Sequence, residues 1–456
     1  MINTLYLPEL REMLAEQDEN GLREFCSALH PARTAEFMEG LTPDEAWEVL
    51  RYADDTTRVE IFLYFDRERQ LEILRRGEPD EMGRFIGELP PDDRVDILQD
   101  LEPELVETLM KHVPVQERRD IMRLSAYPED TAGAIMTTEF ARINRNVTPR
   151  TALEEIGRQA EELETIYYIY VVDEENHLDG VVSARQLLAA LGKPNVLVRD
   201  LMETELITAH VNDDQADVAR KVADYDLLAI PVVDDERHLV GIVTHDDVID
   251  VFVDEATEDA HMMGAVTPLE RSYLDARFFN IWRKRVGWLA LLLVGESLTI
   301  VAMTRFESAM AAVLALSFFV PLCISTGGNS GSQAAALVIR ALALGEITVG
   351  DWWRVVRREV MMGLAMGAAL GIIGFLYGAM TPAVSLGDVS RWMLATVVGL
   401  AIAVICLWGT LVGTMLPIGF QRLGIDPGFA SNPAVATLVD VTGIVIYFSV
   451  ATLLIL

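Results

Sequence analysis

The sequence predicts a multidomain protein with an all-α soluble N-terminal domain, an α/β tandem pair of small modules, and a transmembrane domain of five α-helices. Three observations support this prediction. Apolar residues recur at helical spacing between proline turns at the start of the chain, strand-like runs repeat once in its middle, and long apolar segments follow. The predicted boundaries are 1–130, 131–198, 199–253 and 282–456, with an acidic connecting helix and linker over 245–281.

Related phrases mark the helices of the N-terminal domain. LTPDEAWEVL, LPPDDRVDIL and LEPELVETLM each combine a proline turn, acids suited to a helix N-terminus, and an apolar face. Several similar helical hairpins in a row predict either a small solenoid or a plain helical bundle. Both alternatives give a soluble acidic domain.

An internal repeat fills the middle of the chain. Ile169–Asp173 and Leu178–Ser183 recur, at one constant offset, as Ile230–Asp234 and Leu239–Thr244. Short β-branched runs joined by an acidic turn are typical of β-hairpins. The repeat resembles a tandem pair of cystathionine-β-synthase (CBS) modules, and this resemblance implies a ligand-sensing unit of a kind that often dimerises.

Nucleotide binding at the repeat stays open. Many CBS pairs bind adenine nucleotides through a Ser/Thr-x-x-Asp phrase after the second strand. Thr244 and Asp247 supply that phrase in the second module, whereas Ser183 is followed by Gln186 in the first. Leu227 also stands where an aromatic side chain would stack on a base. ATP binding is therefore an open alternative that these departures disfavour.

A helix predicted over Thr244–Gly264 carries a row of acids. Asp247, Asp250, Asp254 and Glu258 follow one another at spacings of three and four residues, so they lie on one helix face. Like charges at this spacing oppose helix formation unless cations neutralise them. The row is either a cation-binding face or an ordinary solvated face, and its place between the repeat and the apolar segments favours the former.

The acids are concentrated before the apolar segments. Of the formal net charge of −33, residues 286–456 contribute only −1, with seven Arg, no Lys and eight acids. An acidic front attracts cations and repels nucleic acid, so no nucleic-acid partner is expected.

The three scattered cysteines match neither a disulfide framework nor a zinc site, and the N-terminus shows no signal-peptide pattern. No GxxxxGK[ST] loop is present, and we expect no enzymatic activity.

Five apolar segments predict five membrane-spanning helices. They cover about 286–303, 310–344, 360–380, 392–420 and 432–456, and the second is long enough to bend. With the acidic front in the cytosol, eight Arg or Lys flank these segments on the inside and two on the outside. This distribution predicts a cytoplasmic N-terminus and an external C-terminus.

The last segment contains one acid, Asp440, about 12 Å from its start at Asn432. A charge at that depth is costly, so the carboxylate is predicted to face a water-filled path or a cation. The alternative is a protonated, hydrogen-bonded packing residue.

The second segment contains the phrase TGGNSGSQ (326–333), whose glycines permit close helix contact. Asn329 of this phrase is predicted at the level of Asn432, so that two amides converge below Asp440.

The phrases GGNSGSQ and ASNPAVATLVDVTG, with the CBS-like pair and the acidic helical front, resemble the MgtE family of magnesium channels or transporters. The resemblance implies a homodimer in the lipid of a bacterial plasma membrane, with a pore on the two-fold axis. It implies that Mg²⁺ moves down its electrochemical gradient and closes the pore when it binds the cytosolic domains. Alternatives are a CBS-regulated transporter of another divalent cation (Mn²⁺, Co²⁺) or of a different solute, and a membrane-anchored sensor without transport.

The resemblance also implies roles for individual residues. Gly328 and Ala436 would line the pore together with Asp440, Asn329 and Asn432. Regulatory Mg²⁺ would be bound by acids of the cytosolic segments and of the turn before the last helix, namely Asp92 (or its neighbour Asp93), Asp214, Asp226, Asp247, Asp250, Glu255, Glu258, Asp259 and Asp426.

Overall fold

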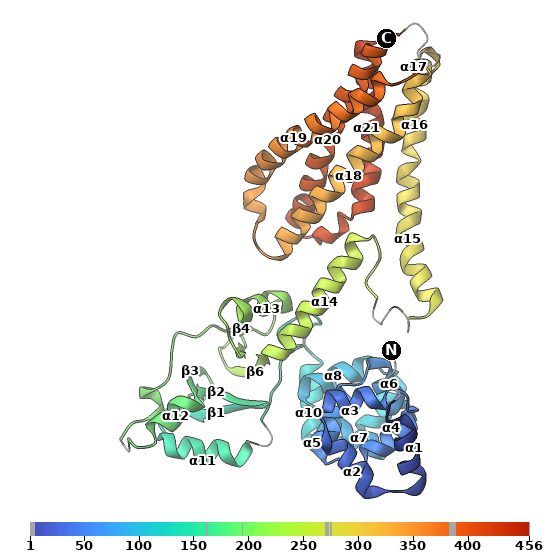
Figure 1. The fold of residues 1–456 in the computed structure, drawn as a ribbon. Coiled ribbons are helices and arrows are strands. Elements are labelled where there is room, and N and C mark those ends of the chain that lie inside the picture. Colours follow the sequence, from blue (N-terminus) through green and yellow to red (C-terminus); the bar gives the residue numbers. More distant parts are fainter. Residues whose placement is uncertain are drawn as a thin grey trace. The chain divides into compact units, whose positions relative to one another are not determined.

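The computed structural model describes residues 5–160, 163–193, 195–269, 273, 276–382 and 389–455. The chain divides into two compact units, Met1–Asp254 and Glu255–Leu456. The division falls inside helix α14 (His245–Met263), so the acidic helix predicted over Thr244–Gly264 is confirmed as one element (Figure 1).

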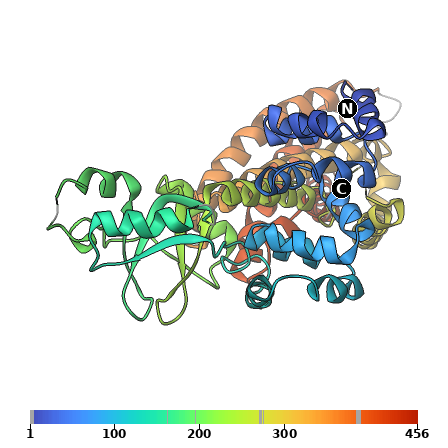
Figure 2. The ribbon, with the colours of Figure 1, turned by 90° about the horizontal axis from the view of Figure 1, so that it is seen from below.

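Short helices open the first unit, and their starts follow from the sequence. Pro43 is the first residue of α4, and Thr42 and Glu45 form a capping box around it. Each helix packs against helices one to three places along the chain, as α3 does on α5 and α4 on α6, and this local pairing is typical of stacked helical hairpins. Figures 1 and 2 show these helices in blue to cyan: α1 (Leu7–Glu16), α2 (Glu19–Ala28), α3 (Pro31–Met38), α4 (Pro43–Leu50), α5 (Asp55–Leu63), α6 (Arg67–Arg76), α7 (Pro79–Glu88), α8 (Pro91–Gln99), α9 (Pro103–Met110) and α10 (Val115–Leu124).

Two small sheets of equal topology follow, as the internal repeat predicts. In each, the first strand is parallel to the second and the second forms an antiparallel hairpin with the third. The register pairs Ile169 with Val182 and Ile230 with Val243, so both predicted hairpins are confirmed at equivalent positions of the repeat. The strands are β1 (Phe140–Asn144), β2 (Thr165–Val172), β3 (Leu178–Ser183), β4 (Ala209–His210), β5 (Ala229–Val233) and β6 (Leu239–Thr244). The helices among them are α11 (Pro149–Gln159), α12 (Ala184–Ala190), the 3₁₀ helix η1 (Val198–Asp200) and α13 (Gln215–Asp224).

The second unit is built from long apolar helices. These are α15 (Phe278–Glu296), α16 (Leu298–Arg305), α17 (Glu307–Ala312), α18 (Ala315–Ala343), α19 (Trp352–Ala379), α20 (Arg391–Arg422) and α21 (Asn432–Leu454), with 3₁₀ helices η2 (Val349–Asp351) and η4 (Pro427–Phe429). Within the described residues, four stretches are long and apolar enough to cross a membrane: Phe278–Arg305, Val349–Ala379, Arg391–Arg422 and Asn432–Leu454.

The second predicted segment differs from the other four. Its helix α18 is 29 residues long, but the polar phrase at 326–333 interrupts the apolar run, and α18 is not among the four stretches. The predicted bend is a break at Val313, whose extended backbone separates α17 from α18. Two predicted starts were too late, since α15 begins at Phe278 and α19 at Trp352. Charged residues such as Arg283 end the apolar run but not the helix, so composition marks the apolar middle and not the helix ends.

Small residues let these helices pack closely. α20 contacts α18, α19 and α21 (Figure 1). The buried residues of α19 are all glycines, at 363, 367, 371, 374 and 378, and they form the face that packs on α20. In a lipid environment, close backbone approach of this kind supplies the packing energy that the hydrophobic effect supplies in water. The close packing holds the polar phrase of α18 against α20 and α21.

Candidate functional site

Asp440 lies half-buried on α21, beside the polar phrase of α18. A Cβ atom placed on Gly328 would lie 3.5 Å from Asp440 Oδ1 and 3.5 Å from Ala436 Cβ. A side chain larger than hydrogen at position 328 would therefore cover the carboxylate. The structure thus brings together three of the five predicted pore residues, on two facing helices.

Asn432 is the first residue of α21. Its backbone carbonyl accepts a hydrogen bond of 3.1 Å from Ser332 Oγ, which ties the phrase on α18 to the start of α21. Its side-chain Oδ1 is buried and has no hydrogen-bond partner within the described part of the chain. A buried carbonyl oxygen without a partner is costly, so this oxygen is a candidate acceptor for a bound water or ion.

Asn329 differs from Asn432 in the exposure of its side chain. Its side chain is exposed on α18, and its Nδ2 donates only a long hydrogen bond of 3.4 Å to Ser325 Oγ, one turn earlier. Among the described residues no hydrogen bond joins Asn329 to Asn432, and the predicted convergence of the two amides stays a prediction. The exposed position leaves Asn329 available to a surface outside this single chain.

Glu296 is a carboxylate that the sequence reasoning passed over. It ends α15, lies half-buried, and is close enough to Asp440 for the two carboxylates to repel each other. Helix α15 reaches α21 here, because a Cβ atom on Gly295 would lie 3.2 Å from Thr437 Cγ2. The signal was present in the sequence, since Glu296 is an acid in an apolar run just as Asp440 is.

A second group of carboxylates lies in the first unit, where α8 approaches the start of α14. Burial, and then the charge of Asp247, raise the pKa of Asp92 well above its usual range and that of Asp93 to about 7. Burial also raises the pKa of Asp247 to about 6, against hydrogen bonds from Thr244 that lower it. One oxygen of Asp92 is buried without a hydrogen-bond partner in the described chain. Asp92 and Asp93 therefore lie close enough to Asp247 to feel its charge, and their binding of regulatory Mg²⁺ stays a prediction.

The other end of α14 belongs to the second unit. Burial, and then the charge of Asp426, raise the pKa of Asp259, while Arg340 lowers it. Asp426 itself accepts a hydrogen bond of 2.6 Å from the backbone N–H of Gly428. Met263 packs on an apolar cluster of α18 and α21 that includes Val435. The structure thus places Asp259 near Asp426, and the predicted Mg²⁺ site at these acids stays a prediction.

The remaining predicted regulatory acids are spread along α13 and α14. Asp250 is exposed, and burial together with the charge of Asp246 raises its pKa. Glu255 is half-buried and Glu258 exposed on α14. Asp214 caps the N-terminus of α13 and Asp226 follows its C-terminus, so a helix of 10 residues separates them. Within the described residues no three His, Cys, Asp or Glu side chains converge as a metal site.

The raised pKa values predict how packing in the first unit depends on pH. The packed state binds more protons than the separated state between the usual pKa near 3.8 and the raised value of about 7. Without divalent cations, contact of α8 with α14 is therefore stable at acidic pH and is lost as pH rises through that window. We expect the distance between spin labels on α8 and α13 to lengthen from pH 5 to pH 8.

Mg²⁺ should replace the protons. At pH 8, millimolar Mg²⁺ is expected to restore the short distance, because a divalent cation neutralises two carboxylates at once. The Asp92→Asn/Asp93→Asn/Asp247→Asn triple variant removes the three buried carboxylates, and its distance should depend much less on pH. A wild-type distance independent of both pH and Mg²⁺ would contradict the electrostatic account.

Comparison with known proteins adds independent information. Family models match this chain at residues 320–450 (MgtE, divalent cation transporter), 29–130 (MgtE intracellular N domain), and 132–193 and 198–254 (CBS domain). The magnesium transporter MgtE of Thermus thermophilus is 39% identical over 450 residues, covering 98% of this chain and 97% of the relative. The magnesium transporter MgtE of Enterococcus faecalis is 34% identical, covering 97% and 96%.

Two solved structures resemble the first part of the chain. The soluble part of a magnesium transporter is 37% identical, with a TM-score of 0.51, and covers 55% of this chain and 97% of its own. The cytosolic domain of the Mg²⁺ channel MgtE in complex with ATP is 36% identical, with a TM-score of 0.50, and covers 53% and 98%. Since two full-length relatives align from end to end at 39% and 34% identity, the chain belongs to the MgtE family of divalent cation transporters.

Proposed function

We propose that the protein is a homodimeric Mg²⁺ channel of the bacterial plasma membrane, with a cytoplasmic N-terminus and a pore formed by α18 and α21. The observation that carries the proposal is the half-buried Asp440 carboxylate against Gly328 in the middle of apolar helices. A charge in that position is rare and marks an ion path. Two-fold symmetry would supply a second carboxylate, and the exposed Asn329 of each chain would face the same axis.

The chemistry of the site suits Mg²⁺. This ion dehydrates reluctantly and keeps several waters when proteins bind it. A carboxylate pair held apart would contact those waters, and the unpartnered Oδ1 of Asn432 would accept from one of them. Few direct ligands also allow release, which conduction requires. The names of the relatives support Mg²⁺ over Mn²⁺ or Co²⁺ as the natural substrate.

Gating by internal Mg²⁺ would act through α14. This helix carries Asp247 near one end and Asp259 near the other, and each lies among other carboxylates. Mg²⁺ bound to these groups would hold α14 at the cytosolic base of α21, where Met263 packs on Val435. Closure then follows if Mg²⁺ binds this arrangement more tightly than the open one.

ATP is less well supported than Mg²⁺ as the regulator of this protein. The related cytosolic domain was solved as an ATP complex. In this chain Asp247 of the Thr-x-x-Asp phrase accepts hydrogen bonds from Thr244 and faces Asp93. In the first module, Gln186 stands where the Asp of this phrase would be, and its side chain forms a capping box with Ser183. We therefore assign regulation to Mg²⁺.

Current through the reconstituted protein tests the proposal. Full-length protein in planar bilayers should conduct Mg²⁺, and millimolar Mg²⁺ on the face that carries the soluble unit should close it. Mn²⁺, Co²⁺ and Ca²⁺ added singly to the opposite face measure selectivity. Absence of Mg²⁺ current at all internal concentrations would contradict the channel, and current insensitive to Mg²⁺ on either face would contradict the gating.

A further inference from the structure

Two histidines face each other where the two CBS modules meet. His177 lies in the turn between β2 and β3, and His238 lies in the equivalent turn of the second module, between β5 and β6. The two residues are directly opposite in an antiparallel bridge. The turns are joined by backbone hydrogen bonds from Leu178 N–H to Arg237 O (3.2 Å) and from Leu239 N–H to Asn176 O (3.1 Å). The pair is thus held by backbone and not by flexible loops.

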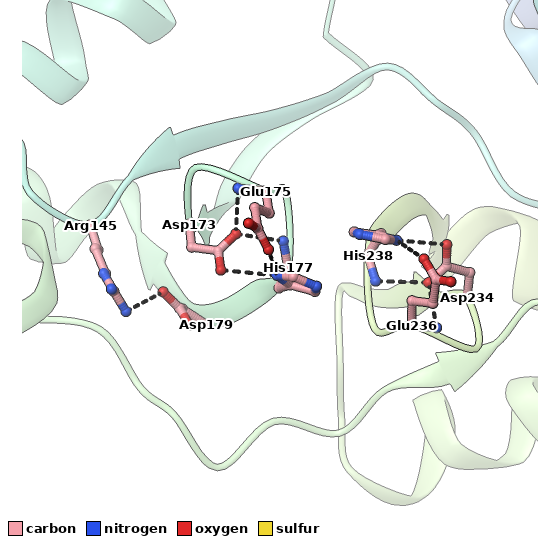
Figure 3. Close-up of polar contacts among 8 residues, drawn as sticks. All are labelled: Arg145, Asp173, Glu175, His177, Asp179, Asp234, Glu236 and His238. Atoms are coloured by element: carbon pink, nitrogen blue, oxygen red, sulfur yellow. Dashed lines mark hydrogen bonds and ion pairs between the residues drawn. The ribbon is translucent and has the colours of Figure 1, made fainter.

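The imidazole rings are stacked, with centroids 4.6 Å apart and planes 17° from parallel (Figure 3). His177 Nδ1 is 2.9 Å from Asp173 Oδ2, and His238 Nδ1 is 3.0 Å from Asp234 Oδ2. Both aspartates are fixed in turn, since each accepts backbone N–H bonds from the residues two and four positions later. The same arrangement therefore occurs twice, once in each module.

This arrangement determines which ring nitrogen is free. An ionised carboxylate only accepts hydrogen bonds, so in the neutral form of each ring Nδ1 carries the hydrogen and Nε2 keeps its lone pair. A carboxylate behind Nδ1 is the outer partner that metal-binding histidines usually have. The side chains are partly exposed, His177 by 33% and His238 by 27%, so solvent ions can reach the pair. Glu175 and Glu236 lie 3.9 and 3.7 Å from the respective Nδ1 atoms and add negative charge beside the pair.

We propose that His177 and His238 bind one transition-metal cation of the Zn²⁺ class through their Nε2 atoms and so link the two CBS modules. Imidazole nitrogen suits Zn²⁺, Ni²⁺ and Cu²⁺, whereas Mg²⁺ requires oxygen ligands. An imidazole binds a metal through a lone pair that lies in the ring plane, so the two nearly parallel rings must rotate out of the stacked arrangement before both Nε2 atoms reach one ion at about 2.1 Å. No third protein ligand converges in the described chain, so water completes the shell and binding is reversible.

The site goes beyond the proposed function because its ligands and its cation differ from those of the acidic clusters. It lies on the hairpin turns of the CBS pair, where a bound ion would fix one module against the other. Protons compete with a metal for imidazole nitrogen, so affinity for the metal is expected to rise with pH. Charged groups beside the pair include Asp173, Glu175, Asp234 and Glu236, with Asp179 engaged by Arg145 (Figure 3). Arg142 donates a hydrogen bond to Asn176, the neighbour of His177.

The proposal is tested by calorimetric titration of the full-length protein with ZnCl₂. An excess of Mg²⁺ is present throughout and occupies the oxygen sites. Wild type should bind one Zn²⁺ per chain at this site. His177→Gln and His238→Gln should each weaken that binding at least tenfold, and Asp173→Asn should weaken it about tenfold through the lost outer partner. His210→Gln is the matched control, because His210 pairs with Asp235 at 3.0 Å in the same CBS pair but is not one of the two stacked imidazoles.

The outcomes are separable from folding and from the proposed function. Unchanged melting temperatures without Zn²⁺ would show that the variants fold, and a fall in wild-type affinity from pH 8 to pH 6 would report proton competition at imidazole. Zn²⁺ affinity that is equal in wild type, His177→Gln and His238→Gln would overturn the site. An equal loss in His210→Gln would also overturn it, by showing general surface binding. Mg²⁺ current plays no part in this test.

Discussion

Replacing Asp440 by asparagine is expected to reduce Mg²⁺ current about a hundredfold or more. At ~5 Å and an effective dielectric of ~20, one unit charge interacts with another by about 3 kcal/mol, which corresponds to roughly a hundredfold in occupancy. A divalent ion and a symmetric second carboxylate both increase this figure. Asparagine keeps the shape of the side chain beside Gly328 and removes only the charge.

Glu359→Gln is the matched control for that variant. Glu359 is likewise a half-buried acid in a long apolar helix, but it lies on α19, away from α21. Its current should stay within a factor of two or so of wild type if charge at Asp440, and not any half-buried acid of the second unit, carries conduction. Single-channel recording separates lower conductance from lower open probability. Wild-type current in Asp440→Asn would remove the pore assignment.

Much of the fold follows from local patterns. The two equivalent hairpins were predictable because alternating β-branched runs and acidic turns recur twice, and α14 because its acids keep helical spacing. Asp440 was predictable because one charge in an apolar run is a strong signal. These features depend on residues close together in the sequence.

Features that depend on distant parts of the chain were harder to predict. The sequence does not say that Asn329 faces outward while the side-chain oxygen of Asn432 is buried, because that depends on how α18 is rotated against α21. The stacking of His177 on His238 needs the two modules to meet at their turns. Glu296 carried the same signal as Asp440 and was overlooked; only the approach of α15 to α21 makes its position relevant.

The glycines of the polar phrase illustrate the same limit. Close helix contact was predicted for them, but the partner was unknown. The structure provides it: α20 presents Gly409 to Gly327 and Gly413 to Gly331, with backbone atoms in direct contact. A Cβ atom on Gly413 would lie 2.0 Å from the carbonyl oxygen of Gly331. Because the clash is with backbone in two helices, no side-chain rotation relieves it.

Gly413→Ala is therefore expected to destabilise the membrane unit by about 3 kcal/mol or more, since overpacking against backbone forces helices apart. For a unit of this size that corresponds to a fall of roughly 10 °C in melting temperature. A thiol-reactive dye measures it directly, because Cys323 and Cys406 are buried in this unit and become reactive on unfolding. Gly419→Ala in the same helix is the control, since nothing lies within 4 Å of its Cβ position.

The two membrane variants test one structural idea from different sides. Separating α18 from α20 displaces Gly328 as well as Gly331, so Gly413→Ala should lose Mg²⁺ current along with stability. Asp440→Asn should lose current and keep the melting temperature. Gly413→Ala could instead melt early yet conduct normally below its melting temperature. In that case α18 would support the pore without lining it, and Asp440 would face a path formed by α21 and its other neighbours. Equal melting of Gly413→Ala and Gly419→Ala would instead contradict the close contact between α18 and α20.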